Sequence, residues 1–108
     1  MTWMVETLNA LVDAELGALP ASLRARLTRI VEPIEAVGLE NVREPHVAHL
    51  EGKLWEMRAK AKEGIARAIY VTATGRRIVI LHVFVKKSQK TPKAALEIAQ
   101  QRAKEVLP

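Results

Sequence analysis

The chain contains 108 residues, a length typical of one domain, so we expect a single domain over residues 1–108. It has no cysteine, which excludes disulfide bonds and zinc sites built from thiolates. The net charge of +5 is uneven: residues 1–52 carry four Arg and eight acidic residues, whereas residues 53–108 carry thirteen Lys and Arg and four acidic residues. This bias predicts a polyanion-binding surface in the second half, with a merely solvated face as the alternative.

The first half of the sequence predicts two helices. Residues 2–7 alternate weakly and are compatible with a short strand or with the start of a helix. Apolar residues then recur at helical spacing over residues 8–19, and again from Ser22, the expected N-cap, to residue 38. Pro33 predicts a kink or a partial break in the second helix.

The second half predicts a small sheet followed by a helix. Residues 39–52 are expected to form a connecting loop. Alternating or β-branched patterns predict strands over residues 53–59, 65–72 and 76–85, joined by turns, and a last helix over residues 92–107. We therefore expect an α+β fold, in which two N-terminal helices pack on a small antiparallel meander sheet that a C-terminal helix follows.

Three lysines precede the last predicted helix. They are Lys86, Lys87 and Lys90, and Thr91 and Pro92 follow as the expected N-cap and first-turn residue. Because a helix N-terminus already favours phosphate groups, the added ammonium groups predict a phosphate-binding site. The alternative is a solvated loop whose lysines keep the apolar strand from pairing with another chain.

Charged residues also occur within the first two strands of the predicted meander. Arg67 shares a strand face with Ile69 and Val71, and a guanidinium on an apolar face needs a partner because unpaired burial is costly. That partner is either a bound phosphate or Glu56 on the neighbouring strand, and the same alternatives hold for Arg58. Glu56 is itself either a proton acceptor or a salt-bridge partner.

The histidines indicate no metal site. His82 lies near the end of an apolar strand, where it is either a hydrogen-bonded core residue or, beside the lysines, an acid or base. His46 and His49 are three residues apart, but the adjacent Pro45 and the lack of a third ligand nearby argue against zinc. We expect neither a metal nor another cofactor.

The sequence also favours a cytoplasmic protein. Residues 1–10 include Glu6 and no Lys or Arg, unlike the basic start of a secretory signal. The longest apolar run, residues 78–85, is interrupted by His82 and is too short to span a bilayer.

Three parts of the sequence together carry a family resemblance. They are residues 44–47 with 49–58, then residues 64–65 with Arg67 and Tyr70, and finally residues 82–92. They cover about half of the chain, in register with the predicted elements. In these segments the chain resembles the RelE/HigB superfamily of toxins from bacterial type II toxin–antitoxin systems, and more specifically its phage-derived HigB-like branch.

The resemblance implies a metal-independent endoribonuclease that cuts messenger RNA, in association with the ribosome, and blocks translation. In such toxins the ribose 2′-hydroxyl attacks its adjacent phosphate, and basic residues on the strands and before the last helix hold the charge. The matching positions here are Arg58, Arg67, Lys87 and Lys90, which we expect to be catalytic. The residues expected to bind RNA are Lys53, Lys60, Lys62, Arg76, Lys86 and Lys93.

The sequence departs from the family pattern at two places. Glu56 stands where RelE has a lysine, and the last helix lacks the terminal Tyr or His of some members. The resemblance therefore leaves the general acid and base open, with Glu56 and His82 as the candidates.

Two other functions fit the same resemblance. The fold also serves ParE-like inhibitors of gyrase, which are not nucleases, and a non-catalytic nucleic-acid-binding or co-repressor module is a third alternative. The resemblance further implies a cognate antitoxin, of the helix-turn-helix HigA type, as a partner. Messenger RNA and the ribosome are the other expected partners, with operator DNA reached only through the antitoxin and no membrane.

Overall fold

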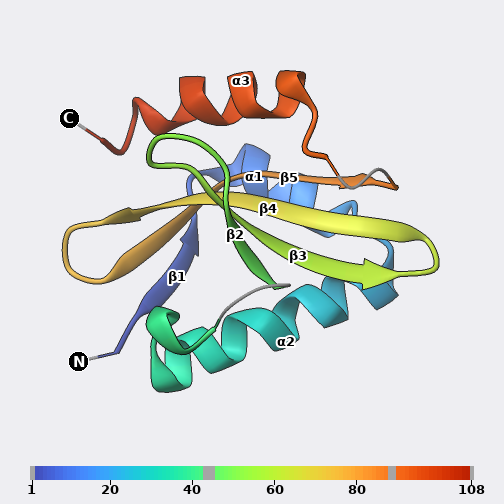
Figure 1. Ribbon diagram of the computed structural model, residues 1–108, viewed down its shortest axis with the longest axis horizontal. Helices are drawn as coiled ribbons and strands as arrows, with labels where there is room; N and C mark the ends of the chain where they lie inside the picture. Colours follow the sequence, from blue (N-terminus) through green and yellow to red (C-terminus); the bar gives the residue numbers. More distant parts are fainter. Residues whose placement is uncertain (1, 43–45, 88–89, 108) are drawn as a thin grey trace.

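A computed structural model describes residues 2–42, 46–87 and 90–107 of the chain. It shows one sheet with helices on both of its faces (Figure 1). In chain order the elements are β1 (Met4–Thr7), α1 (Ala10–Gly17), α2 (Ala21–Val37), the 3-10 turn η1 (Leu39–Asn41), β2 (Val47–His49), β3 (Trp55–Ala61), β4 (Gly64–Ala73), β5 (Arg77–Lys86) and α3 (Lys93–Ala103).

Within the described residues the sheet has five strands in the order β1-β5-β4-β3-β2. The predicted meander is confirmed as β3, β4 and β5, which pair antiparallel. The prediction of a purely antiparallel sheet is wrong, because β1 pairs in parallel with β5. The prediction of a plain loop over residues 39–52 is also wrong, because this segment contains η1 and β2. A strand of three residues is too short to produce an alternating pattern in the sequence.

The helices divide the hydrophobic core into two layers. Helices α1 and α2 cover one face of the sheet, whereas α3 covers the other, and Figure 1 shows α2 and α3 on opposite sides. The α1/α2 layer contains Val12, Leu23, Leu27, Met57, Tyr70 and Ile78. The α3 layer contains Leu54, Ile69, Val71, Leu81, Ala95 and Ala99. Alternate residues of β3, β4 and β5 therefore point to opposite layers, which determines the face on which each charged side chain lies.

Two predicted helix caps are wrong. Helix α2 begins at Ala21 after Pro20, and the Ser22 hydroxyl instead donates a hydrogen bond to the Glu63 carboxylate at 2.6 Å. Helix α3 begins after Pro92, and the hydroxyl of Thr91 turns inward toward the sheet. Within the described residues, no helix combines the length and the apolar composition needed to cross a membrane.

Candidate functional site

A buried charged cluster lies on the α3 side of the sheet. Glu56 and Arg67 are both fully buried, and Arg67 Nη1 donates to Glu56 Oε1 at 3.3 Å. The Thr91 hydroxyl donates to Glu56 Oε2 at 2.7 Å and lies 3.2 Å from Arg67 Nη1. The ion pair with Glu56 that the sequence offered as one alternative for Arg67 is therefore present.

Strand register explains why this cluster forms. Arg58 on β3 lies opposite Arg67 on β4, so two guanidinium groups share one face of the sheet. Glu56, two residues before Arg58, contacts both: Arg58 Nε donates to the same carboxylate oxygen that Arg67 bonds. Burial lowers the pKa of Arg67, and the negative charge of Glu56 opposes this effect. The carboxylate thus offsets a repulsion between two neighbouring cations.

The members of the cluster differ in their access to solvent. The Arg58 side chain is 31% exposed, whereas those of Arg67 and Glu56 are fully buried. A bound phosphate can therefore contact Arg58 directly, whereas Arg67 and Glu56 are closed off from solvent and both are hydrogen-bonded to Thr91. The catalytic roles that the sequence predicts for these residues stay predictions.

The predicted lysine segment borders this cluster. Lys86 ends β5, Lys87 and Lys90 follow it, and all three side chains are exposed. Because Thr91 is hydrogen-bonded to Glu56, the chain at Lys90 is held against the buried charges. Exposed cations therefore stand close to the one cluster member that reaches solvent. Residues 43–45 and 88–89, which belong to the segments that carry the family resemblance, lie outside the described residues.

The structure gathers only some of the other predicted RNA-binding residues. Lys60 and Lys86 both lie opposite Ile65 in the sheet, and Lys62 occupies the adjoining hairpin. Lys93 is the first residue of α3. In contrast, Lys53 precedes β3, and Arg76 occupies the β4–β5 turn at the opposite end of the sheet. One end of the sheet is thus the more basic.

His82 belongs to a separate polar group at the edge of β5. Its Nδ1 lies 3.0 Å from Glu15 Oε1, and Arg102 also bonds Glu15. Burial raises the pKa of Glu15, but hydrogen bonds from the Val83 N–H, His82 and Arg102 outweigh this and leave the pKa below its usual value. His82 therefore fits the hydrogen-bonded alternative. It lies two strand spacings, about 10 Å, from Glu56 in the same row of the sheet.

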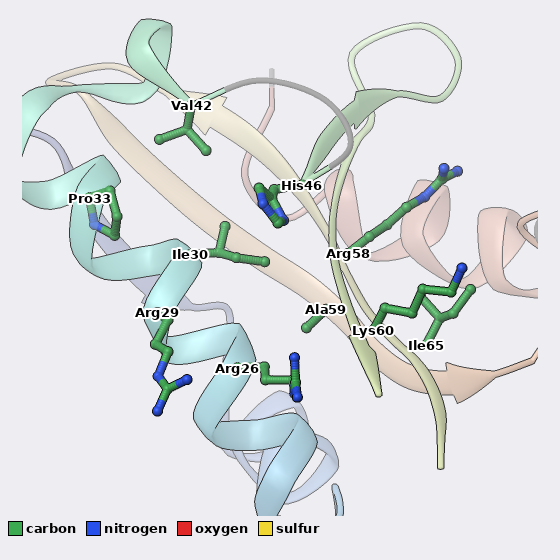
Figure 2. A pocket seen from close by; sticks show the side chains of 10 residues that line it. All are labelled: Arg26, Arg29, Ile30, Pro33, Val42, His46, Arg58, Ala59, Lys60 and Ile65. Carbon is green, nitrogen blue, oxygen red and sulfur yellow. The ribbon is translucent and has the colours of Figure 1, made fainter. Parts of the chain in front are cut away.

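A second basic feature is a groove of about 550 Å³ between α2 and β3, which we call the α2–β3 groove. Figure 2 shows His46 in the middle of this groove and Arg26 between the helix and the strand. The lining residues are Arg26, Arg29, Ile30, Pro33, Val42, His46, Arg58, Ala59, Lys60 and Ile65.

Sequence reasoning did not assign Arg26 and Arg29 to a site. Their one sequence signal is that both basic residues lie off the apolar stripe of α2. Elsewhere, His49 Nε2 lies 2.9 Å from the Gly52 carbonyl. Across the described ranges, no three His, Asp or Glu side chains gather closely enough to hold a metal ion.

Comparisons with known proteins relate the chain to a protein family and to a solved structure. The family model described as phage derived protein Gp49-like matches residues 14–104. Among solved structures, the chain is similar to the archaeal RelE–RelB complex from Pyrococcus horikoshii OT3, with a TM-score of 0.57 and 26% sequence identity. This match covers 83% of the present chain and 100% of the other. No curated protein matches the sequence.

Proposed function

The chain belongs to the Gp49-like family of phage-derived proteins, a RelE/HigB-like family of type II toxins, and from this premise we propose that it is a metal-independent endoribonuclease. Its substrate is messenger RNA, cut in association with the ribosome, so that translation stops. One observation carries the proposal. Arg58 bonds the buried Glu56, which also bonds Arg67, and Arg58 lies near exposed lysines.

The reaction that these residues would support needs charge stabilisation and proton transfer. The ribose 2′-hydroxyl attacks the adjacent phosphorus while the bond to the 5′ oxygen of the next nucleotide breaks, leaving a 2′,3′-cyclic phosphate. One group accepts the hydroxyl proton and another protonates the leaving oxygen. Cations stabilise the negative charge that builds on the phosphate in the transition state.

We assign these tasks according to exposure. Arg58, Lys87 and Lys90 contact the phosphate, since their side chains reach solvent. Arg67 lies beneath and acts as a positioning residue, because it holds the carboxylate that Arg58 bonds. Glu56 and His82 remain the proposed proton-transfer groups, although Glu56 requires the Thr91 contact to open before it can act.

The remaining assignments concern binding and partners. Lys53, Lys60, Lys62, Arg76, Lys86 and Lys93 are proposed to contact the RNA backbone, where each cation adds affinity by releasing counterions. The matching archaeal structure is a complex of RelE with RelB. By analogy, this chain pairs with a cognate antitoxin, which we place in the helix-turn-helix HigA class, and acts in the cytoplasm.

The proposal is tested by inducing the protein in a bacterium with and without its antitoxin. Induction alone should stop growth, primer extension should map new 5′ ends within messenger RNA, and the antitoxin should suppress both effects. Cleavage should continue in excess EDTA wherever the ribosome is not needed or is held intact by other means. Intact messenger RNA with accumulating DNA breaks would instead support the ParE-like inhibition of gyrase, and a strict, restorable need for Mg²⁺ would refute metal independence.

A further inference from the structure

We propose that the α2–β3 groove is a second binding site for the substrate, which holds nucleotides of single-stranded RNA that flank the bond to be cut. This inference rests on the proposed ribonuclease function and extends it to a surface that the catalytic assignment does not use. It also gives a role to basic residues of the otherwise acidic first half of the chain.

The lining of the groove is chemically one-sided. No acidic residue of the described chain lines it. Its polar residues are all cationic or histidine, namely Arg26, Arg29, His46, Arg58 and Lys60. They come from three separate segments, namely α2, the residue before β2, and β3. The rest of the lining is apolar and suits the flat faces of bases and riboses: Ile30, Pro33, Val42, Ala59 and Ile65. The volume of about 550 Å³ lies within the range of roughly 300–1,000 Å³ that is usual for ligand pockets.

Arg58 pairs with Glu56, and Arg26 interacts electrostatically with Glu63, but the other two cations of the groove have no salt bridge within the described part of the chain. Arg29 and Lys60 are exposed, and neither forms an ion pair with any other described residue. Several like charges around one concave surface raise its positive potential, because field lines concentrate in a cleft with low-dielectric walls. A strand of phosphates relieves this repulsion.

The groove is continuous with the proposed cleavage site. Arg58 belongs to both, because it contacts Glu56 in the buried cluster and also lines the groove. Figure 2 shows Arg58 and Lys60 projecting from β3 away from α2, while Arg26 lies on the α2 side. Cations therefore run from the α3 face of the sheet, around the edge of β3, to the outer surface of α2. An RNA strand cut beside Arg58 has a basic path to follow on one side of the cut.

The geometry favours RNA over an acidic peptide that adds a strand to the sheet. At the mouth of the groove the edge of β3 is already occupied, since the Arg58 N–H donates to the His46 carbonyl at 2.8 Å. Only the short remainder of β3, to Ala61, is left for an added strand. The guanidinium group of arginine also suits phosphate, because it can bind two phosphate oxygens through two parallel hydrogen bonds.

The test is a binding measurement on the whole protein with an RNA that cannot be cut. Fluorescence anisotropy follows a labelled 2′-O-methyl RNA of about 12 nucleotides, and a second one of about 4 nucleotides, over a range of salt concentrations. The variant is Arg26→Gln/Arg29→Gln. The matched control is Arg24→Gln/Arg77→Gln, which also removes two positive charges, because Arg24 bonds the Gly17 carbonyl and Arg77 pairs with Glu6, both outside the groove.

We expect the groove variant to bind the longer RNA about tenfold more weakly than the control does. The slope of log affinity against log salt should fall in magnitude by about 1.4, because each phosphate contact with a single strand contributes about 0.7. The groove variant should lose less affinity for the shorter RNA than for the longer one. Arg29→Gln alone, at an exposed position, should give half of the change in slope and serves if the double variant folds poorly.

Two results overturn the inference while leaving the ribonuclease proposal intact. In the first, the wild type binds the longer RNA and the groove variant binds it like the control. In the second, the groove variant keeps its affinity for RNA but loses binding to an oligoglutamate peptide, which would make the groove a site for an acidic protein segment. If the wild type binds no RNA and its induction leaves messenger RNA intact, the proposed function fails and the inference with it.

Discussion

Removing either member of the buried Glu56–Arg67 pair should strongly destabilise the protein, and removing both should cost less than the sum of the two single losses. Both side chains are fully buried, so Arg67→Met leaves a carboxylate and Glu56→Gln leaves a guanidinium in the protein interior. Breaking a buried pair in this way costs about 3–5 kcal/mol of the free energy of unfolding.

The two single variants should not be equal. In Arg67→Met, Glu56 keeps its contact with Arg58 and its hydrogen bond from Thr91, which places the loss near the lower end of the range. In Glu56→Gln, both arginines lose their carboxylate, which places the loss near the upper end. A loss of about 3 kcal/mol lowers the melting temperature by roughly 12–24 °C in a domain of this size. The double variant contains no unpaired buried charge, so it should recover about 1–3 kcal/mol relative to the sum of the single losses.

Urea unfolding followed by circular dichroism measures all three variants against the wild type. The control is Arg77→Met, which breaks the exposed pair of Arg77 and Glu6 and should cost less than about 1 kcal/mol. Strictly additive losses in the double variant would refute the reasoning, because the two charges would then not stabilise each other. A loss for Arg67→Met no larger than that for Arg77→Met would refute it as well.

Three other results follow from the structure. Tyr70→Phe should raise the free energy of unfolding by about 1 kcal/mol, because the buried Tyr70 hydroxyl has no hydrogen-bond partner among the described residues; a less stable variant in urea unfolding would contradict this. Glu15→Gln should lower the melting temperature at neutral pH, because folding lowers the pKa of Glu15. The difference from the wild type should vanish as the pH falls from the usual carboxyl pKa of 4.5 through the lower pKa of folded Glu15. A difference that persists in acid would contradict a stabilising role of the ionised Glu15 carboxylate. Lys87→Ala should lower the rate of RNA cleavage by on the order of a hundredfold with an unchanged melting temperature, whereas Arg76→Ala should weaken RNA binding only modestly; equal effects of the two variants would argue against a site at Lys87.

Elements with a long, regular pattern could be predicted from the sequence, whereas those made by distant pairing could not. The strands of the meander alternate over seven or more residues, and α2 and α3 carry clear apolar stripes. Strand β2 spans three residues and exists because Val47 and His49 pair with β3, a contact that no local pattern encodes. The missed caps have a similar cause, since the hydroxyls of Ser22 and Thr91 bond carboxylates far along the chain instead of the nearest helix.

The same division applies to the candidate site. Alternation along two neighbouring strands is enough to offer an ion pair between Glu56 and Arg67 as one of two alternatives, beside phosphate binding. For the third member, Thr91, the sequence predicts a helix cap instead, because a hydroxyl before a proline usually has that role. The basic lining of the α2–β3 groove arises because α2, which belongs to the acidic first half of the chain, packs against β3. A comparison of the net charges of the two halves does not reveal the arginines of this helix.

The parallel pairing of β1 with β5 bears on when the protein becomes folded during its synthesis. Met4 lies opposite Arg77 and Thr7 opposite Ile80, so the edge of the sheet closes only after about three quarters of the chain has been made. Contacts between residues so distant in sequence slow folding, because a long loop must close before they form. While the ribosome is still adding residues before β5, β1 has no partner strand. The growing chain therefore cannot assemble its complete sheet until β5 has been made.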